Sequence, residues 1–489
     1  MSLYAAMPLW VVLSSLLASV IIFALGDEWR RTRTFTNIAA AVIKLILVGI
    51  MLAGVARGDD FGMRVTLAPG LEFVLHADAL TMLLITLSAI LWLVTTIYAI
   101  GYLEDSPNRA RFFGFFSLCV AATMGVASAG NLFTFFIFYE LLTLSTWPLV
   151  VHRGTPRALR AGKKYLAYTL SGGTMLLIGI IGLHVVAGPV DFVHGGFVTE
   201  HTASRPVLTL LFLLMLAGTG VKAALFPLHA WLPTAMVAPA PVSALLHAVA
   251  VVKVGIFGVA RLVYDVYGLE LTALLGMDHV LAGVAAFTII YGSVQALFAG
   301  NIKQRLAWST VSQVSYIGLG IAIAGPLATI GGLVHLVHQG LMKITLFFCA
   351  GNLSKTHEIK EIAQMDGVGW RMPWTMGAFT FAALSMIGVP PMAGFISKWY
   401  LGLGGAASGD YWVIGVLVAS TLLNAAYFLP MLRRAWFVEP VAGATERREA
   451  PLSLLVPTLI TGLLAVGSGF LAGMPLSPLQ WVILISERI

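Results

Sequence analysis

The sequence predicts an all-α, polytopic membrane protein with about 14 transmembrane helices. Hydrophobic residues make up 59% of the 489 residues, charged residues only 10%, and the mean hydropathy is +0.91. A soluble protein would carry about 25% charged residues. Apolar runs also recur from Leu9 to Leu471. Each run approaches the roughly 20 residues that cross a hydrocarbon core about 30 Å thick.

The predicted spans follow one another with short connectors, so we expect no separate soluble domain between them. The first run, Leu9–Leu25, has no basic residue before it and no small-residue cleavage site after it. We interpret it as a retained helix and not as a signal peptide. The spans cover residues 8–25, 37–56, 78–101, 111–129, 131–151, 165–187, 207–232, 241–266, 278–299, 306–325, 327–353, 374–403, 411–436 and 452–473.

The basic residues predict the orientation of the chain. Of the 29 lysines and arginines, 19 lie in the loops after spans 1, 3, 5, 9, 11 and 13, and the opposite loops hold only four. By the positive-inside rule the first set of loops is cytoplasmic. We therefore expect a multi-pass protein of the bacterial inner membrane with both termini on the periplasmic side. The same bias explains the net charge of +7, so no nucleic-acid partner is implied.

The sequence carries no motif for a metal or a cofactor. Cys119 and Cys349, the only cysteines, lie far apart within apolar runs. They exclude a thiolate cage or an iron–sulfur cluster, and we interpret them as small buried hydrophobes. No dinucleotide-binding GxGxxG after a strand, no Walker A motif and no HExxH is present. We expect no cofactor and no metal.

Four charged residues lie at comparable depth within four different spans. They are Glu140, Lys222, Lys253 and Lys343. An ionisable group at the bilayer centre costs at least about 2.5–3.5 kcal/mol, so each one indicates function by default. Their shared depth predicts one continuous layer inside the bundle. The alternative for Glu140 and Lys222 is a structural ion pair between helices.

Span 11 adds a polar stripe to this layer. His335, Gln339 and Lys343 are spaced i, i+4, i+8 and so share one helix face. His338 flanks the stripe, and His247 faces the same region from another height or packs as a buried histidine. Histidine and lysine can both exchange protons, which favours a proton relay. A metal site is disfavoured because no carboxylate or cysteine accompanies the histidines.

Two other basic residues within apolar runs predict anchoring rather than transport. Lys44 lies about seven residues from the cytoplasmic end of its predicted span, so we expect its side chain to snorkel to the interface. Lys44→Arg should then be nearly silent. Arg261 lies near the outer interface, where we expect it to anchor the helix.

Helix breakers accompany the charges in two spans. Pro227 follows Lys222 in span 7, and an opened helix is tolerated in lipid only where protein or water satisfies the freed groups. Paired breaks predict inverted repeats of five helices, spans 4–8 and 9–13. The expected units are residues 1–105, 106–268, 276–437 and 450–489. The second break, in span 12, contains Pro390, Pro391, Gly394 and Lys398.

Five blocks of the sequence resemble one family in their order. They are "FYELLTLSTW", "GVKAALFPLHAWLPTAMVAPAPVSALLHAVAVVKVG", "GNIKQRLAWSTVSQVSYIGLG", "HLVHQGLMKITLFFCAGNL" and "GVPPMAGFISKW". Together they are similar to the antiporter-like subunits shared by Mrp-type cation/proton antiporters and respiratory complex I. The resemblance covers roughly residues 70–405. It implies fourteen helices, inverted five-helix repeats and broken spans 7 and 12.

The resemblance also implies roles for individual residues. Glu140 and Lys222 match a glutamate–lysine pair that joins spans 5 and 7. Lys253, Lys343 and Lys398 match the lysines of spans 8, 11 and 12. His335 matches a common histidine of span 11, whereas Gln339 stands where another histidine is frequent. With His247 and His338, these residues form the expected path for protons.

Within the family, "VVKVG" and the lysine of span 12 look most like the D-type subunits of Mrp antiporters. Only 16 residues follow Gly473, so we expect no long lateral helix. The predicted function is a proton-translocating subunit of a Na⁺ or K⁺/proton antiporter with other membrane subunits as partners. A pump subunit of a complex I-like enzyme, a membrane hydrogenase or an inorganic-carbon uptake complex remains the alternative. Electrons would then run in partner chains. A self-sufficient solute carrier is less favoured, because no substrate pocket is evident.

Overall fold

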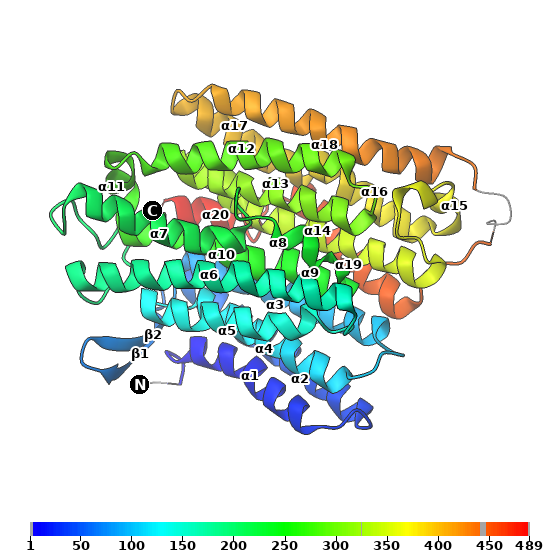
Figure 1. Ribbon diagram of the computed structural model, residues 1–489, viewed down its shortest axis with the longest axis horizontal. Helices are drawn as coiled ribbons and strands as arrows, with labels where there is room; N and C mark the ends of the chain where they lie inside the picture. Colours follow the sequence, from blue (N-terminus) through cyan, green and yellow to red (C-terminus); the bar gives the residue numbers. More distant parts are fainter. Residues whose placement is uncertain (1–2, 324, 441–445, 488–489) are drawn as a thin grey trace.

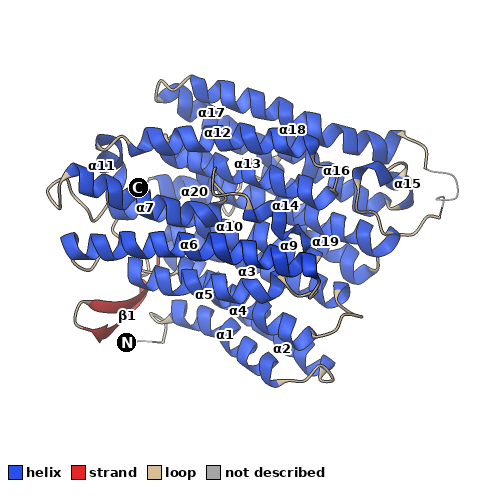
Figure 2. Ribbon diagram, in the orientation of Figure 1, coloured by secondary structure: helices blue, strands red, loops and turns tan. Residues whose placement is uncertain are grey.

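The computed structural model describes residues 3–323, 325–440 and 446–487. Long helices lie side by side along one direction, and a β-hairpin lies at one end of the bundle (Figures 1 and 2). We call this the hairpin end. The opposite end carries α15 and the Lys/Arg-rich loops, and we call it the basic end. The predicted all-α membrane architecture is confirmed.

The α-helices and strands of the described chain are, in order, α1 (Met7–Ala24), α2 (Arg30–Arg57), β1 (Phe61–Ala68), β2 (Leu71–Ala77), α3 (Ala79–Tyr102), α4 (Arg109–Ala127), α5 (Leu132–Val150), α6 (Pro156–Ala187), α7 (Arg205–Ala223), α8 (Trp231–Thr234), α9 (Ala240–Ala244), α10 (Val251–Arg261), α11 (Gly268–Leu274), α12 (Met277–Phe298), α13 (Ile302–Ala322), α14 (Pro326–His357), α15 (Val368–Arg371), α16 (Pro373–Ile387), α17 (Ala393–Ala407), α18 (Trp412–Phe437), α19 (Leu452–Phe470) and α20 (Pro478–Ser486). Two π-helical segments, η2 (Leu245–Val249) and η3 (Leu262–Tyr267), join α9, α10 and α11 into one continuous helix.

Among the described residues, twelve helices are long and apolar enough to cross a membrane. Each of the predicted spans overlaps one or more helices. Two predicted spans have no counterpart among the twelve helices. One corresponds to α13, which is rich in serine, threonine and glutamine, and the other to the broken pair α16 and α17. α13 tolerates its polar residues because they are buried against other helices, not turned to lipid.

The centre of the bundle is formed by α14 and by the continuous helix Ala240–Leu274. The most apolar window of each is entirely buried. The outer helices instead expose large apolar side chains, among them Phe298, Phe437 and Leu463. An apolar outside is what a lipid environment requires, so polar side chains gather in the middle.

A β-hairpin lies where the sequence analysis predicts only a connector between spans 2 and 3. β1 and β2 pair antiparallel, with Phe61 opposite Ala77, and Gly70 turns the chain with φ +75°. The alternating segment "FGMRVTLAPGLEFVLHA" with its Pro-Gly turn carries this signal. The hairpin lies over the turn between α4 and α5, because Gly130 N donates to Val74 O at 2.9 Å.

The expectation for Lys44 is wrong. α2 begins at Arg30 and not near residue 37, so Lys44 lies fourteen residues, about 21 Å, from that end. Its side chain is fully buried between three helices. The ammonium donates to Ser15 Oγ of α1 and lies 4.2 Å from the ring centroid of Trp92 on α3.

We predict that Lys44→Arg destabilises the protein, because the larger guanidinium must fit a closed site. Overpacking of this kind costs about 1–3 kcal/mol. The thermal unfolding midpoint of the purified assembly should fall, and Lys44→Met, which adds no volume, should disturb it less. Lys163→Arg on the exposed face of α6 serves as the control. An unchanged midpoint for Lys44→Arg would show that the side chain reaches the interface after all.

Candidate functional site

The first helix break lies directly after Lys222. α7 ends at Ala223, and Ala224 adopts a left-handed conformation with φ 56°. The indole of Trp231 donates to the carbonyl of Val221 at 2.7 Å, and Phe226 N donates to Thr288 Oγ1 at 3.1 Å. Protein groups therefore satisfy backbone atoms that the break frees, as an apolar surrounding requires.

Lys222 and Glu140 both lie at this break, yet they do not form the expected ion pair within 4 Å. The Lys222 ammonium donates to the carbonyl of Tyr139 and lies 3.2 Å from the centroid of the Tyr139 ring. Lys222 is fully buried, whereas Glu140 is half-buried and its Oε1 has no protein partner. The Lys222 ammonium is therefore bonded to Tyr139 and not to the Glu140 carboxylate beside it.

A glycine on α6 makes room for the Glu140 carboxylate. A Cβ built at Gly173 would overlap both Oε1 and the carboxyl carbon of Glu140. Its neighbour Gly172 lies against Val221 and the carbonyl of Gly218 on α7. The pair therefore lets α6 approach α5 and α7 closely around the carboxylate.

Lys253 connects the first break to the central helix. A Cβ at Gly255 would overlap the backbone of Lys222 and Ala223, so this glycine brings α10 against the end of α7. The Lys253 ammonium lies 2.5 Å from the carbonyl of Leu336 and also donates to Gln339 Oε1. Both acceptors belong to α14.

The polar stripe of α14 lies buried, as the spacing predicts. His335 Nδ1 lies 2.8 Å from Ser397 Oγ of α17, and its Nε2 lies 3.0 Å from Gln313 Oε1 of α13. Lys343 donates to Ser309 Oγ and to the carbonyl of Leu306 at 3.1 Å. The stripe therefore joins α13 and α17 to the helix that receives Lys253.

The second break is closed by Lys398. α16 ends at Ile387, and α17 begins at Ala393. The Lys398 ammonium donates to the carbonyl of Ile387 at 2.6 Å and to Thr421 Oγ1 at 3.0 Å. A cation at a helix C-terminus compensates the partial negative charge of the free carbonyls. Lys398 is only 8% exposed, so its side chain lies inside the protein and does not extend to the membrane interface.

The breakers of this second site have separate effects. A Cβ at Gly394 would overlap the carbonyl of Ser385, so glycine lets α17 start against the end of α16. Pro390 and Pro391 lie between the two helices, as Pro227 lies between α7 and α8. Lys398 also borders a mostly apolar groove of about 470 Å³ between α17 and α18.

Two predicted residues take no part in the hydrogen bonds described above. His247 and His338 are fully buried, and neither ring nitrogen of either residue has a protein partner. The His247 ring lies 4.5 Å from the ring of Phe347, centroid to centroid. The remaining predicted residues form what we call the buried row, consisting of Glu140, Lys222, Lys253, Gln339, His335, Lys343 and Lys398.

The sequence reading missed several neutral partners of the row. Tyr139, Ser309, Gln313, Ser397 and Thr421 each contact one of its charged or imidazole groups. Neutral polar residues are common in helices, so their positions alone carry little signal. Gln313 was the most visible, because an amide within a predicted span needs a buried partner.

The expectation that Arg261 anchors its helix at the membrane interface is wrong. Its side chain is buried, with the guanidinium 2.6 Å from Asp78 Oδ2 and 2.7 Å from Asp265 Oδ2. It also donates to Thr81 Oγ1 at 2.7 Å. This cluster joins the hairpin-end part of the continuous helix to the start of α3.

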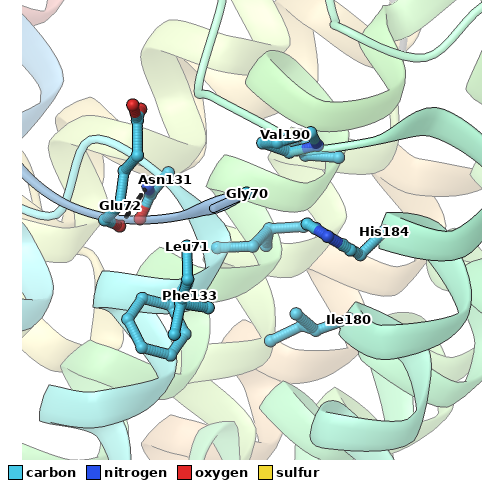
Figure 3. A pocket seen from close by; sticks show the side chains of 10 residues that line it. Gly70, Leu71, Glu72, Asn131, Phe133, Ile180, His184 and Val190 are labelled. Carbon is cyan, nitrogen blue, oxygen red and sulfur yellow. Dashed lines mark hydrogen bonds between the residues drawn. The ribbon is translucent and has the colours of Figure 1, made fainter. Parts of the chain in front are cut away.

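A small pocket at the hairpin end lies apart from the row (Figure 3). It encloses about 30 Å³ beside Gly70, Asn131 and His184, enough for one or two water molecules. Asn131 Nδ2 donates to the carbonyl of Glu72 there at 2.9 Å. Among the described residues, no group of three or more His, Cys, Asp or Glu side chains could hold a metal ion.

Two family profiles match the chain. A family profile described as "NADH:quinone oxidoreductase/Mrp antiporter, TM" matches residues 129–424. A second, described as "NADH-Ubiquinone oxidoreductase (complex I), chain 5 N-terminus", matches residues 68–113. The first profile spans every residue of the row, and the second covers β2, α3 and the start of α4.

Two curated relatives span almost the whole chain. The N-type subunit of the NADH-quinone oxidoreductase of Desulforudis audaxviator is 35% identical over 88% of this chain and 89% of its own. The D-type subunit of the Na(+)/H(+) antiporter of Bacillus subtilis is 27% identical over 93% of this chain and 92% of its own.

Two solved structures share the fold. A chain of the Mrp complex from Dietzia sp. DQ12-45-1b has a TM-score of 0.85 at 23% identity and covers 99% of this chain and 97% of its own. A chain of an archaeal membrane-bound sulfane sulfur reductase has a TM-score of 0.89 at 22% identity and covers 100% and 98%.

We predict that Asp78→Asn destabilises the protein through Arg261. Removing one partner of a buried ion pair costs up to about 3–5 kcal/mol, and the loss here is smaller because Asp265 remains. Asp60→Asn at the same end is the control, because the Asp60 side chain is 86% exposed. The thermal unfolding midpoint of the purified assembly should fall only for Asp78→Asn. Equal midpoints would contradict a stabilising role for the cluster.

Proposed function

The chain belongs to the family of membrane subunits shared by NADH:quinone oxidoreductases and Mrp antiporters, and from this premise we propose that it translocates protons within a multi-subunit cation/proton antiporter. The observation that carries the proposal is the buried row. It runs from the first break through the central helix to the second break. Each of its four lysines is bonded to neutral acceptors, and none to a carboxylate within 4 Å.

Lysine is the residue type that such a path needs. A buried lysine can release and regain its proton, whereas arginine stays charged. Gly255 brings the helices of Lys222 and Lys253 into backbone contact, while the Lys222 ammonium bonds to α5 and the Lys253 ammonium bonds to α14. We propose that a proton arriving at one lysine favours departure from the next, because like charges disfavour one another. Glu140, whose carboxylate lies beside this pair of helices, biases the first step.

Buried polar atoms without a protein partner lie along the row and are suited to bind water. Glu140 Oε1, Gln313 Nε2 and Gln339 Nε2 are buried along the row without a protein partner. Buried polar atoms in proteins are normally hydrogen-bonded, and water is the usual partner where protein offers none. Water at these atoms would connect the protonatable groups. His247 and His338, which also lack partners, would join the path in the same way.

The orientation and internal symmetry belong to the same proposal. Positive-inside asymmetry places the basic end in the cytoplasm of a bacterial inner membrane and both termini on the outer side. Residues 106–268 and 276–437 would be the inverted repeats, each with one broken helix and one lysine beside the break. Residues 1–105 and 450–489 would flank them.

A second function is favoured by the relatives themselves. The relative from Desulforudis audaxviator is named for NADH-quinone oxidoreductase, and another relative is a hydrogenase-4 component. In such a complex this chain would pump protons while electrons run in partner subunits. The lysine in the second broken helix favours the antiporter. Co-purification followed by mass spectrometry decides between them, because the antiporter brings small membrane subunits and the redox enzyme brings iron–sulfur subunits.

We predict that Glu140→Gln, Lys222→Arg and Lys398→Arg each abolish proton-coupled transport while the complex still assembles. The first removes the carboxylate that biases the row, and the others fix a charge that must come and go. The measurement is a pH-gradient assay on vesicles that contain the whole complex, with assembly checked by size-exclusion chromatography. Lys163→Arg should transport like the wild type. Full activity in both arginine variants would reduce these lysines to fixed charges and end the relay proposal.

We predict that Gly173→Ala also suppresses transport, because its methyl group would displace the Glu140 carboxylate. Gly182→Ala on the same helix is the control, since its Cβ would meet only the flexible end of Leu211. Adding Glu140→Asp to Gly173→Ala shortens the acid by one methylene and should restore part of the lost activity. If the double variant is no better than Gly173→Ala, the glycine matters for packing alone.

A further inference from the structure

A cavity of about 280 Å³ opens at the basic end, apart from the buried row. The end of α3, the α5–α6 loop, α8, α9, the start of α13 and the end of α14 surround it. Four cationic side chains line it, and the described lining contains no aspartate or glutamate. The cations are Arg153, Arg157, Lys303 and Lys360.

Several acidic residues near this end are paired with cations that do not line the cavity. Among the described residues, none of the four lining cations forms an ion pair. Glu361, which follows Lys360 in the sequence, accepts a hydrogen bond from Asn301 Nδ2 at 3.0 Å. The ion pairs formed at this end among the described residues are Arg30–Glu104, Arg33–Asp27, Lys355–Asp105 and Arg434–Asp366. The cavity therefore concentrates positive charge that the chain itself does not balance.

Two helix N-termini add to this field. Thr155 caps α6 and Asn301 caps α13, and both capping residues line the cavity. These helices have 32 and 21 residues, so each presents the positive end of its dipole to the cavity. A cavity with cations and helix N-termini on its walls attracts an anion and not a cation or a neutral solute.

We infer that this cavity is a binding site for a phosphate-bearing anion. A tetrahedral phosphate offers several oxygens at once, which suits a cavity lined by two arginines and two lysines from different elements. The volume leaves room for a small organic group beside the phosphate. The phosphate comes either from an anionic lipid headgroup of the adjacent leaflet or from a soluble phosphate compound.

The position of Lys303 links this site to the central helix. Its ammonium donates to the carbonyl of Ala238 at 2.6 Å and lies 3.5 Å from Ser243 Oγ. Ser243 belongs to α9, the first part of the continuous helix that carries His247 and Lys253. A bound anion would therefore neutralise positive charge where that helix begins.

The test compares a site variant with a charge-matched control in the full complex. Arg157→Gln with Lys360→Gln removes two exposed lining cations, and Arg160→Gln with Lys163→Gln removes two exposed cations of α6 outside the cavity. Thermal unfolding is measured with inorganic phosphate against chloride at equal ionic strength. In parallel, native mass spectrometry counts phosphatidylglycerol retained from mixed phosphatidylglycerol–phosphatidylcholine vesicles.

We expect phosphate to raise the unfolding midpoint, or phosphatidylglycerol to be retained, in wild type and control alike, with apparent affinity at least tenfold weaker in the site variant. A response to phosphate indicates a soluble ligand, and selective lipid retention indicates a headgroup. Equal responses in site variant and control would overturn the assignment. Cross-links from Lys360 to an acidic segment of a partner subunit would also overturn it. Binding is read directly, so failure here leaves the transport proposal untouched, and loss of transport leaves the binding site untouched.

Discussion

The structure depends on one constraint, namely that lipid offers no hydrogen bonds to an interrupted helix. Two spans are interrupted, and each interruption leaves carbonyl and amide groups that protein must satisfy. At the first, Trp231 and Thr288 supply the partners, and Lys222 lies in the last turn before the gap. At the second, Lys398 itself bonds the freed carbonyls. The lysines thus have a structural reason to lie where transport would also need them.

Much of this arrangement follows from the sequence, because the depth of a residue in the membrane follows from its distance along the chain to the ends of its apolar run. Counting apolar residues places Lys222, Lys253 and Lys343 in the middle of their spans, and helical periodicity places His335, Gln339 and Lys343 on one face. The same counting fails where a helix extends beyond its apolar run. The polar first turns of α2, "RRTRTFT", hide the true depth of Lys44.

Other features depend on which helix packs against which, and that information is not local. Arg261 reads as an anchor until α3 brings Asp78 beside it. The sequence predicts a Glu140–Lys222 ion pair, but in the folded chain the Lys222 ammonium donates to the carbonyl of Tyr139. Gly173, Gly255 and Gly394 carry no chemistry of their own, yet Gly173 leaves room for the Glu140 carboxylate, and the other two let the backbones of neighbouring helices approach closely. Neutral partners and close approaches are therefore visible only in the folded chain.

The hairpin end shows how the fold can outlast its sequence. There β2 bonds the turn between α4 and α5, that turn bonds residues 190–192, and residues 193–198 bond Asp265 and Val266, all through main-chain atoms. Main-chain bonds place few demands on the identity of the side chains that flank them. Substitutions can therefore accumulate at this end while its shape persists, except in the Asp78–Arg261–Asp265 cluster and at the closely packed Gly130, Gly196 and Gly268. Such drift fits chains that share less than a quarter of their residues and still superpose over nearly their whole length.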